Sequence, residues 1–229
     1  MSSDRFDSSA DQPIAEPFRG EPTPAVNQPE PAHAMLVIIS GPSGVGKDTI
    51  IEALQKRGHR PEYHYVVTCT TRVRRPNEID GVSYNFVTLA EFAALREAGD
   101  LLEANEVHDN WYGTPKSGVR SALARGQHAI LKIDVQGADV VRARVPDALL
   151  IFIAPPSVDA LLERLTSRAT ETADELALRQ RNAAAEMARQ KDYDYVVVNE
   201  TGELTRTAER IGEIIALEGA RHAERRVRI

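Results

Sequence analysis

An apolar run, a glycine-rich loop and a helix-forming stretch follow one another near residue 40. The apolar run, Met35–Ser40, reads MLVIIS, and residues 41–50 read GPSGVGKDTI. Glycines let the backbone approach an anion closely, and a helix that starts after them points the positive end of its dipole at the same place. This order of segments predicts a strand, a phosphate-binding loop and a helix, which indicates an α/β fold.

The loop supplies the first set of candidate ligands. We expect Lys47 to reach the outer phosphates of a nucleotide as a point charge. Asp48 stands where such loops usually have the Ser or Thr hydroxyl that holds Mg²⁺. Its carboxylate is a hard oxygen ligand, so Asp48 is our candidate for the metal, with Thr49 as the alternative. The residues expected around the phosphates are Gly41, Pro42, Ser43, Gly44, Val45, Gly46, Lys47, Asp48 and Thr49.

Apolar or β-branched runs alternate with longer helical patterns along the rest of the chain. We expect strands at residues 35–40, 65–69, 129–134, 148–154 and 195–199. We expect helices at about residues 47–56, 116–125, 138–144, 158–167 and 172–190, and from about Leu204 to the basic terminus. Near-continuous apolar strands separated by helices predict a parallel sheet covered by helices on both faces.

Two segments depart from this pattern. Residues 1–34 contain six prolines, six acidic residues and only two arginines, so we expect a disordered tail. Residues 35–225 should form one domain with a core at 35–70 and 115–225. Residues 71–114 offer short alternating strands and one helix, which predicts a small mixed α+β insertion that contributes a substrate pocket.

Composition limits the class of protein. The net charge is −6, and most of it belongs to the tail, which argues against a nucleic-acid binder held by a positive surface. The single cysteine, Cys69, excludes an internal disulfide framework and is expected to be a small buried side chain. No stretch approaches the ~20 apolar residues that span a bilayer. We therefore expect a cytoplasmic protein with small-molecule partners, whose oligomeric state the sequence leaves open.

A second basic cluster follows the second predicted strand. The segment TCTTRVRRPNEIDGVSYNF contains Arg72, Arg74, Arg75 and Tyr84. Two guanidinium groups and a phenol can hold a phosphate dianion through planar, bidentate contacts. The sequence thus predicts a second phosphate site.

The order of these motifs resembles that of the guanylate kinases, which are P-loop nucleoside monophosphate kinases. The motifs are GPSGVGK, TTRVRRPNEIDGVSYNF, LLEANEVHDNWYGT, IDVQGA, IFIAPPS, RLTSRATETADELALR and YVVVN. The resemblance implies a P-loop core, a GMP-binding insertion at 71–114 and a helical lid at about 157–190. It also implies Mg²⁺-dependent transfer of the γ-phosphoryl group of ATP to GMP or dGMP.

The resemblance assigns roles to individual residues. Those implied to bind the phosphate of GMP are Arg72, Arg75, Tyr84 and Tyr112, and those implied to surround guanine are Thr68, Glu103, Thr114 and Asp134. Arg168 and Arg179 are implied to reach the transferring phosphoryl group, and Asn199 to lie near adenine. The implied catalytic residues are Lys47, Arg72, Arg168 and Arg179.

The chemistry of guanine supports the assignment of Glu103 independently. Guanine presents two adjacent donors, N1–H and the exocyclic amine, and one carboxylate can accept both. Adenine lacks this pair of donors, so a buried carboxylate would be left unpaired and would penalise the wrong base.

Two departures from the common family pattern qualify this interpretation. Asp48 replaces a hydroxyl, and Lys132, in LKID, occupies a position that is often acidic. If that acidic residue assists the metal through its water shell, Lys132 removes one contact where Asp48 supplies another.

Two alternative functions remain. Ribose 1,5-bisphosphate phosphokinases also tend to have GKD in the phosphate loop, but they would not need Glu103. Noncatalytic guanylate-kinase-like modules bind proteins instead, but they tend to lose the charges that Lys47, Arg168 and Arg179 supply here.

Overall fold

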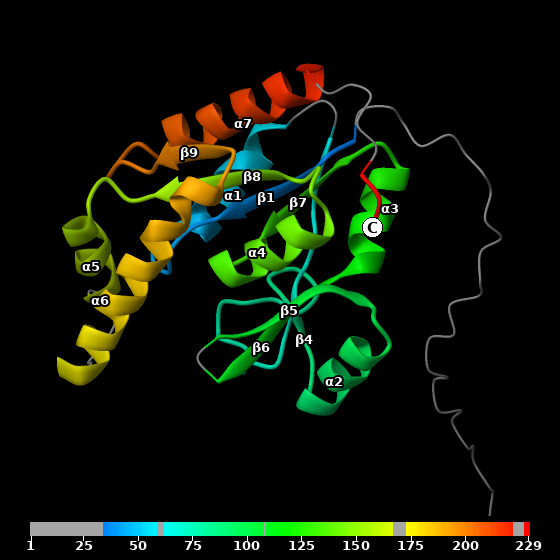
Figure 1. The fold of residues 1–229 in the computed structure, drawn as a ribbon, viewed down its shortest axis with the longest axis horizontal. Coiled ribbons are helices and arrows are strands. Elements are labelled where there is room, and N and C mark those ends of the chain that lie inside the picture. The colour runs from blue at the N-terminus through cyan, green and yellow to red at the C-terminus, as the bar shows by residue number, and fades with distance from the viewer. Residues whose placement is uncertain (1–33, 59–61, 108, 167–172, 222–226) are drawn as a thin grey trace, which may run out of the picture.

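Figure 1 shows the computed structural model of the chain, which describes residues 34–58, 62–107, 109–166, 173–221 and 227–229. Two sheets and the helices around them make up this part of the chain. The predicted tail lies outside the described residues except for Ala34, which is buried.

The larger sheet has five strands, all parallel, in the order β2-β7-β1-β8-β9. The strands are β1 (Leu36–Ser40), β2 (Tyr63–Tyr65), β7 (His128–Lys132), β8 (Leu149–Ala154) and β9 (Tyr195–Val198). The predicted parallel α/β sheet is therefore confirmed. β1 lies at its centre, so the glycine-rich loop leaves the middle of the carboxyl edge, where open α/β sheets bind ligands.

One predicted strand is wrong in its extent. The run Tyr65–Cys69 is not a single strand, because β2 ends at Tyr65 and β3 (Cys69–Thr70) belongs to the other sheet. The Val66 N–H still bonds Ile130 in the large sheet, whereas the Thr68 carbonyl already bonds Asn85 in the small one. A continuous apolar run cannot reveal such a change of partner, because both environments are buried.

Helices cover both faces of the large sheet. The helices α1 (Lys47–Arg57) and α7 (Leu204–Arg221) pack on one face, and α3 (Lys116–Ala124) and α4 (Val135–Arg144) on the other. The side chains of β1 alternate between these layers: Val37 and Ile39 join the first core cluster, and Leu36 and Ile38 the second. Burial on both faces explains why the first four residues of this strand are all apolar.

The smaller sheet has the mixed character predicted for residues 71–114. Its order is β4-β3-β6-β5, with β3 parallel to β4 and antiparallel to β6. The elements are β4 (Asn85–Phe86), α2 (Leu89–Glu97), β5 (Leu101–Val107) and β6 (Asn110–Pro115). Thr88 and Glu91 form a capping box at the start of α2, whose Phe92 packs against Cys69 and Leu101.

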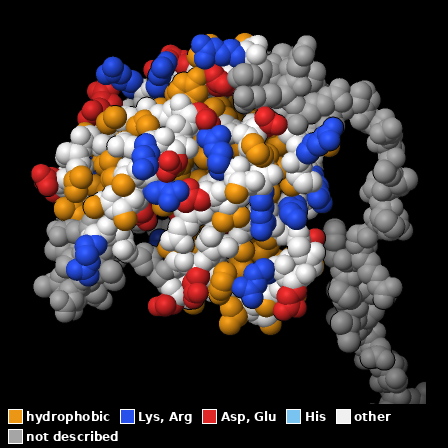
Figure 2. Space-filling model, in the orientation of Figure 1, with side chains coloured by type: hydrophobic (Ala, Val, Ile, Leu, Met, Phe, Trp, Pro, Cys, Tyr) orange, Lys and Arg blue, Asp and Glu red, His pale blue; other side chains and the backbone are white. Residues whose placement is uncertain are grey.

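Two further helices, α5 (Val158–Thr166) and α6 (Ala173–Ala188), lie side by side and project from one end of the large sheet, and a short 3₁₀ turn, η1 (Arg189–Asp192), follows them. They coincide with the predicted lid, whose function stays a prediction. No helix in the described part of the chain has both the length and the apolar character needed to cross a membrane. On the face in Figure 2, basic and acidic side chains are interspersed.

Candidate functional site

The glycine-rich loop has the backbone that its sequence predicts. Gly41, Gly44 and Gly46 all have positive φ angles, of 146°, 80° and 99°. A Cβ atom on Gly41 would lie 2.3 Å from the carbonyl oxygen of Ile153 in β8, so only glycine fits between these strands. The three glycines thus shape the turn that leads from β1 into α1.

Lys47 closes the loop from one side. Its Nζ donates hydrogen bonds to the carbonyl oxygens of Gly41 and Pro42, at 2.7 and 3.0 Å. Burial lowers its pKa, whereas the carboxylates of Glu186 and Asp134 raise it. This ammonium is fixed beside the amides that would hold a phosphate.

A carboxylate of α6 already uses one of those amides. The Ser43 N–H donates a 3.0 Å hydrogen bond to Oε2 of Glu186. The sequence did not single out Glu186, because nothing in a helical pattern marks which residue faces a distant loop. Its contact demonstrates that the loop accepts an oxygen anion at this position.

Asn199, predicted to lie near adenine, braces the loop from behind. Its Nδ2 donates to the Val45 carbonyl at 2.8 Å, and its Oδ1 accepts from the Thr207 hydroxyl at 3.2 Å. Both ends of the amide therefore have protein partners, and a contact with adenine stays a prediction.

Three of the four predicted acceptor-phosphate residues, Arg72, Tyr84 and Tyr112, lie close together on the small sheet. The Arg72 guanidinium lies 5.6 Å from the centre of the Tyr84 ring, and the rings of Tyr84 and Tyr112 are 6.1 Å apart. Glu78, which sequence reasoning missed, accepts from Arg72 at 2.6 Å and from the Arg75 backbone N–H at 2.8 Å. Its spacing of three residues from Arg75, which suits a turn, is the one signal that could have revealed it.

Three of the four residues predicted around guanine, Glu103, Thr114 and Asp134, lie together around a buried carboxylate. Glu103 is only 2% exposed, and its two oxygens accept hydrogen bonds from the Thr114 hydroxyl and the Asn105 side-chain amide, both at 2.7 Å. Burial raises the pKa of Glu103 to about 7, a shift that Asp134 enlarges and these hydrogen bonds oppose. Asn105 was missed, although its position two residues after Glu103 puts it on the same face of β5.

Asp134 lies near this carboxylate and has a structural task as well. Its side chain accepts from the Gly137 N–H at 2.6 Å and caps α4, so that this helix begins at Val135, three residues earlier than predicted. A Cβ atom on Gly137 would lie 3.1 Å from Oε2 of Glu103. The buried Thr68 lies between β2 and β3, and its contact with guanine stays a prediction.

The two lid arginines cannot be placed in the site. Arg168 lies outside the described residues, and Arg179 belongs to α6 but its side chain is not described. Their predicted roles therefore stay predictions.

The metal-binding residues expected from the sequence have protein partners. The Asp48 carboxylate pairs with the Lys132 ammonium, and the Thr49 hydroxyl donates to the Gly46 carbonyl at 2.8 Å. Within the described residues, no three His, Cys, Asp or Glu side chains gather in a group that could hold a metal ion. This donor set fits an ion that a nucleotide brings with its phosphates and water, since Mg²⁺ usually keeps several waters.

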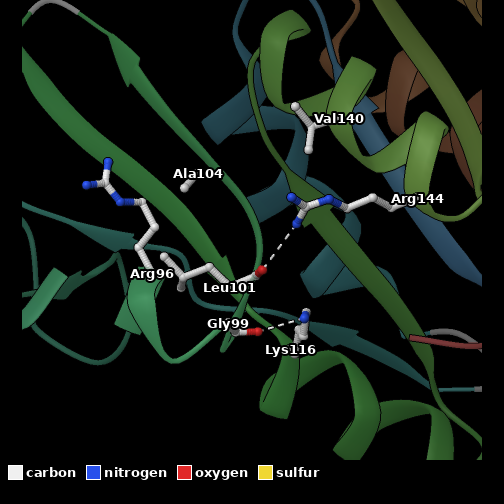
Figure 3. A pocket seen from close by; sticks show the side chains of 7 residues that line it. All are labelled: Arg96, Gly99, Leu101, Ala104, Lys116, Val140 and Arg144. Carbon is white, nitrogen blue, oxygen red and sulfur yellow. Dashed lines mark hydrogen bonds between the residues drawn. The ribbon is translucent and has the colours of Figure 1, made fainter. Parts of the chain in front are cut away.

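A separate pocket of about 430 Å³ lies between the small sheet and helices α3 and α4. Figure 3 shows its lining residues, which are Arg96, Gly99, Leu101, Ala104, Lys116, Val140 and Arg144. None of them is a predicted site residue. The Lys116 ammonium donates to the Gly99 carbonyl and Arg144 to the Leu102 carbonyl, both at 2.6 Å, so both cations already serve the packing between elements.

Comparison with known proteins decides the family. The guanylate kinase family model matches residues 33–217. The chain belongs to the guanylate kinase family. A guanylate kinase of Chelativorans sp. (strain BNC1) is 43% identical over 83% of this chain and 86% of the relative. Guanylate kinase 2, chloroplastic/mitochondrial, of Oryza sativa subsp. japonica is 41% identical over 93% of this chain and 72% of its own length.

Among solved structures, the guanylate kinase from Anaplasma phagocytophilum superposes with a TM-score of 0.67 at 30% identity. The match covers 84% of this chain and 90% of that one. This likeness to a guanylate kinase fold extends over both sheets, so the family resemblance stated from the motifs is confirmed.

Proposed function

We propose that this member of the guanylate kinase family transfers the γ-phosphoryl group of ATP to the phosphate of GMP, giving ADP and GDP. The observation that supports it best is the buried Glu103 carboxylate, on the strand that pairs with the strand of Tyr112. Each carboxylate oxygen has two lone pairs, so beside its bonds from Thr114 and Asn105 this carboxylate can still accept the two adjacent donors of guanine.

The residues act by positioning and charge neutralisation. The attacking oxygen of GMP is already negative at neutral pH, so no general base is needed. An oxygen of the GMP phosphate forms a bond to the γ-phosphorus while the bond to the β–γ bridging oxygen breaks, and ADP leaves with that oxygen. Lys47 and the loop amides hold the donor, and Arg72, Tyr84 and Tyr112 hold the acceptor. Arg168 and Arg179 would neutralise charge on the group in transit.

Magnesium is part of the proposal. Mg²⁺, when bound with ATP, would neutralise charge on the donor phosphates. Asp48 and Thr49 are the side chains of this chain expected to face it. The proposed acceptor is GMP or dGMP, and the proposed location is the cytoplasm.

The alternatives fit the site less well. A ribose 1,5-bisphosphate phosphokinase would leave the Glu103 carboxylate without a base to recognise. A noncatalytic module would have no use for the Lys47 ammonium, which two loop carbonyls fix beside the loop amides.

The decisive assay measures ADP release with ATP and Mg²⁺ while the acceptor is varied among GMP, dGMP, AMP and ribose 1,5-bisphosphate. We expect turnover with GMP and not with AMP. Lys47→Ala should lower kcat by about 10³-fold or more, because it removes a fixed positive charge from the transferred group. Lys56→Ala, at the exposed end of the same helix, is the control and should leave kcat unchanged. Equal rates with AMP would refute the proposed base recognition.

A further inference from the structure

Lys132, the last residue of β7, lies between the two halves of the proposed reaction centre. It pairs in register with Ile39 of β1, so it stands at the carboxyl edge of the sheet, beside the strand that leads into the phosphate loop. Its side chain is only 22% exposed. A lysine that is mostly buried at this edge needs partners for its charge.

The Lys132 ammonium has one partner on each side. On the donor side, Nζ donates a hydrogen bond to Oδ1 of Asp48, in the first turn of α1. On the acceptor side, Nζ lies 4.9 Å from the centre of the Tyr84 ring. Burial lowers the pKa of Lys132, but Tyr84 and Asp48 raise it above its ordinary value, so the group stays charged at neutral pH.

Each partner belongs to one substrate site. Asp48 follows Lys47, whose ammonium is fixed across the phosphate loop. Tyr84 is in contact with Arg72 and Tyr112, which are proposed to bind the phosphate of GMP. A phosphate held by Arg72 and Tyr84 would therefore lie beside the ammonium of Lys132. The same ammonium faces the region through which the γ-phosphoryl group must pass.

We propose that Lys132 is a catalytic cation that contacts the acceptor phosphate and the phosphoryl group in transit, and that Asp48 is the positioning residue that holds it there. This inference rests on the proposed function. Lys132 forms no bond to phosphorus and transfers no proton; it stabilises negative charge during the bond exchange described above. The two departures from the common family pattern, Asp48 and Lys132, then act together, because the Asp48 carboxylate orients the Lys132 ammonium.

Two other interpretations of the pair make different predictions. The ion pair could merely join α1 to β7, in which case its loss would alter stability and leave substrate binding alone. Alternatively, Asp48 could act chiefly as a magnesium ligand, in which case its replacement would change the response to Mg²⁺ whether or not Lys132 is present. The exposed pair between Arg57 and Glu209, at 3.0 Å, joins α1 to α7 and is a matched control.

Binding without ATP or Mg²⁺ gives the first test. Lys132→Met keeps the length of the side chain and removes its charge. Calorimetry should show that the Kd for GMP rises by about tenfold, because one charge-assisted contact is lost. The Kd for guanosine should not change, because guanosine has no phosphate. Lys132→Arg should recover most of the GMP affinity. Arg57→Met should change neither Kd.

Turnover gives the second test. Lys132→Met should lower kcat by about 10²-fold, and Asp48→Asn by a smaller factor, because it leaves the cation present but less well oriented. The double variant should be no slower than Lys132→Met alone, since Asp48 acts through Lys132. Thermal unfolding of each variant verifies that it is folded.

Three results would overturn the inference. The first is a GMP Kd and a kcat in Lys132→Met that stay within about twofold of the unaltered protein, well below the effect of a phosphate contact. The second is equal weakening of GMP and guanosine. The third is that Asp48→Asn raises the Mg²⁺ concentration needed for turnover, and does so equally in the unaltered protein and in Lys132→Met. Failure of the proposed function itself would appear separately, as no GMP turnover by the unaltered protein.

Discussion

Two glutamates of the candidate site have opposite surroundings and therefore different electrostatic behaviour. At Glu78, burial is the largest single influence and raises the pKa, but hydrogen bonds from Arg72 and from the Arg75 amide together with the charges of both arginines lower it overall. Glu103 is buried without a cation among its hydrogen-bond partners, and burial raises its pKa to about 7. Of these two glutamates, Glu103 is the one whose pKa lies near neutral pH, and it is the residue proposed to bind guanine.

We predict that GMP binding weakens as the pH falls through this value. Both donors of guanine require the ionised carboxylate, and at pH 6 a group with a pKa of about 7 is ionised in only about one molecule in ten. The Kd for GMP should therefore rise by about tenfold between pH 8 and pH 6. Glu103→Gln cannot titrate here and should show only the smaller change that comes from the phosphate of GMP. Calorimetric slopes that are identical in the two proteins would contradict the prediction.

The same pKa predicts how the stability of the ligand-free protein depends on pH. Because the pKa is higher in the folded than in the unfolded chain, the folded state binds more protons between these values. The stabilisation is thus full below the unfolded pKa and is lost as the pH rises through about 7. The free energy of unfolding, relative to that of Glu103→Gln, should fall by up to about 3 kcal/mol from pH 4.5 to pH 8. Urea unfolding curves across this range are the measurement.

At the scale of the elements, a carboxylate of α6, that of Glu186, contacts the phosphate loop. Glu186 accepts from the Ser43 N–H, and it is the largest source of the attraction that raises the pKa of Lys47 against burial. A phosphate of ATP would need the same amide and the same ammonium. The Glu186 carboxylate and the donor nucleotide therefore compete for the loop. The Glu186 side chain must leave the Ser43 N–H when ATP binds there.

We predict that Glu186→Gln binds ATP more tightly. Removing the competing charge should lower the Kd for ATP by about three- to tenfold, since a charged hydrogen bond no longer has to be broken. Glu52→Gln makes the same change of charge on the exposed side of α1 and should have little effect. Titration with ATP in the absence of GMP tests this, and unchanged or weaker binding in Glu186→Gln would rule out the competition.

At the scale of the whole molecule, the site depends on how the two sheets are joined. Arg144 of α4 donates to the carbonyls of Leu102 and Leu101 in β5, at 2.6 and 3.4 Å, and so ties the large-sheet layer to the small sheet. The pocket of Figure 3 lies beside this contact, so packing between the layers is incomplete there. The hydrogen bonds of Arg144 therefore help to fix the distance between the base site and the phosphate loop.

We predict that Arg144→Met destabilises the fold. The carbonyls of Leu101 and Leu102 would lose a donor in a buried position, which costs about 1–3 kcal/mol in the free energy of unfolding. Arg210→Met removes an exposed ion pair with Glu213 and should change this free energy by at most about 0.5 kcal/mol. Urea denaturation of both variants measures the difference, and equal values would show that Arg144 does not tie the sheets.

Local residue types were enough to predict the large sheet and the phosphate loop. A strand buried on both faces is mainly apolar, and a loop that approaches an anion closely needs glycines, so both features follow from local residue types. The roles of the individual site residues, among them Thr68, Arg75, Asn199 and the lid arginines, were expected from motifs and stay predictions.

Which side chains form ion pairs or hydrogen bonds with one another became visible only in the folded chain. Residues 48 and 132, 43 and 186, and 72 and 78 meet because strands and helices far apart in the chain pack together or because a loop folds back. Periodicity assigns a side chain to a face, but not to a partner on another element. The division of the run Tyr65–Cys69 between two sheets has the same cause, since an apolar residue is equally suited to either interior.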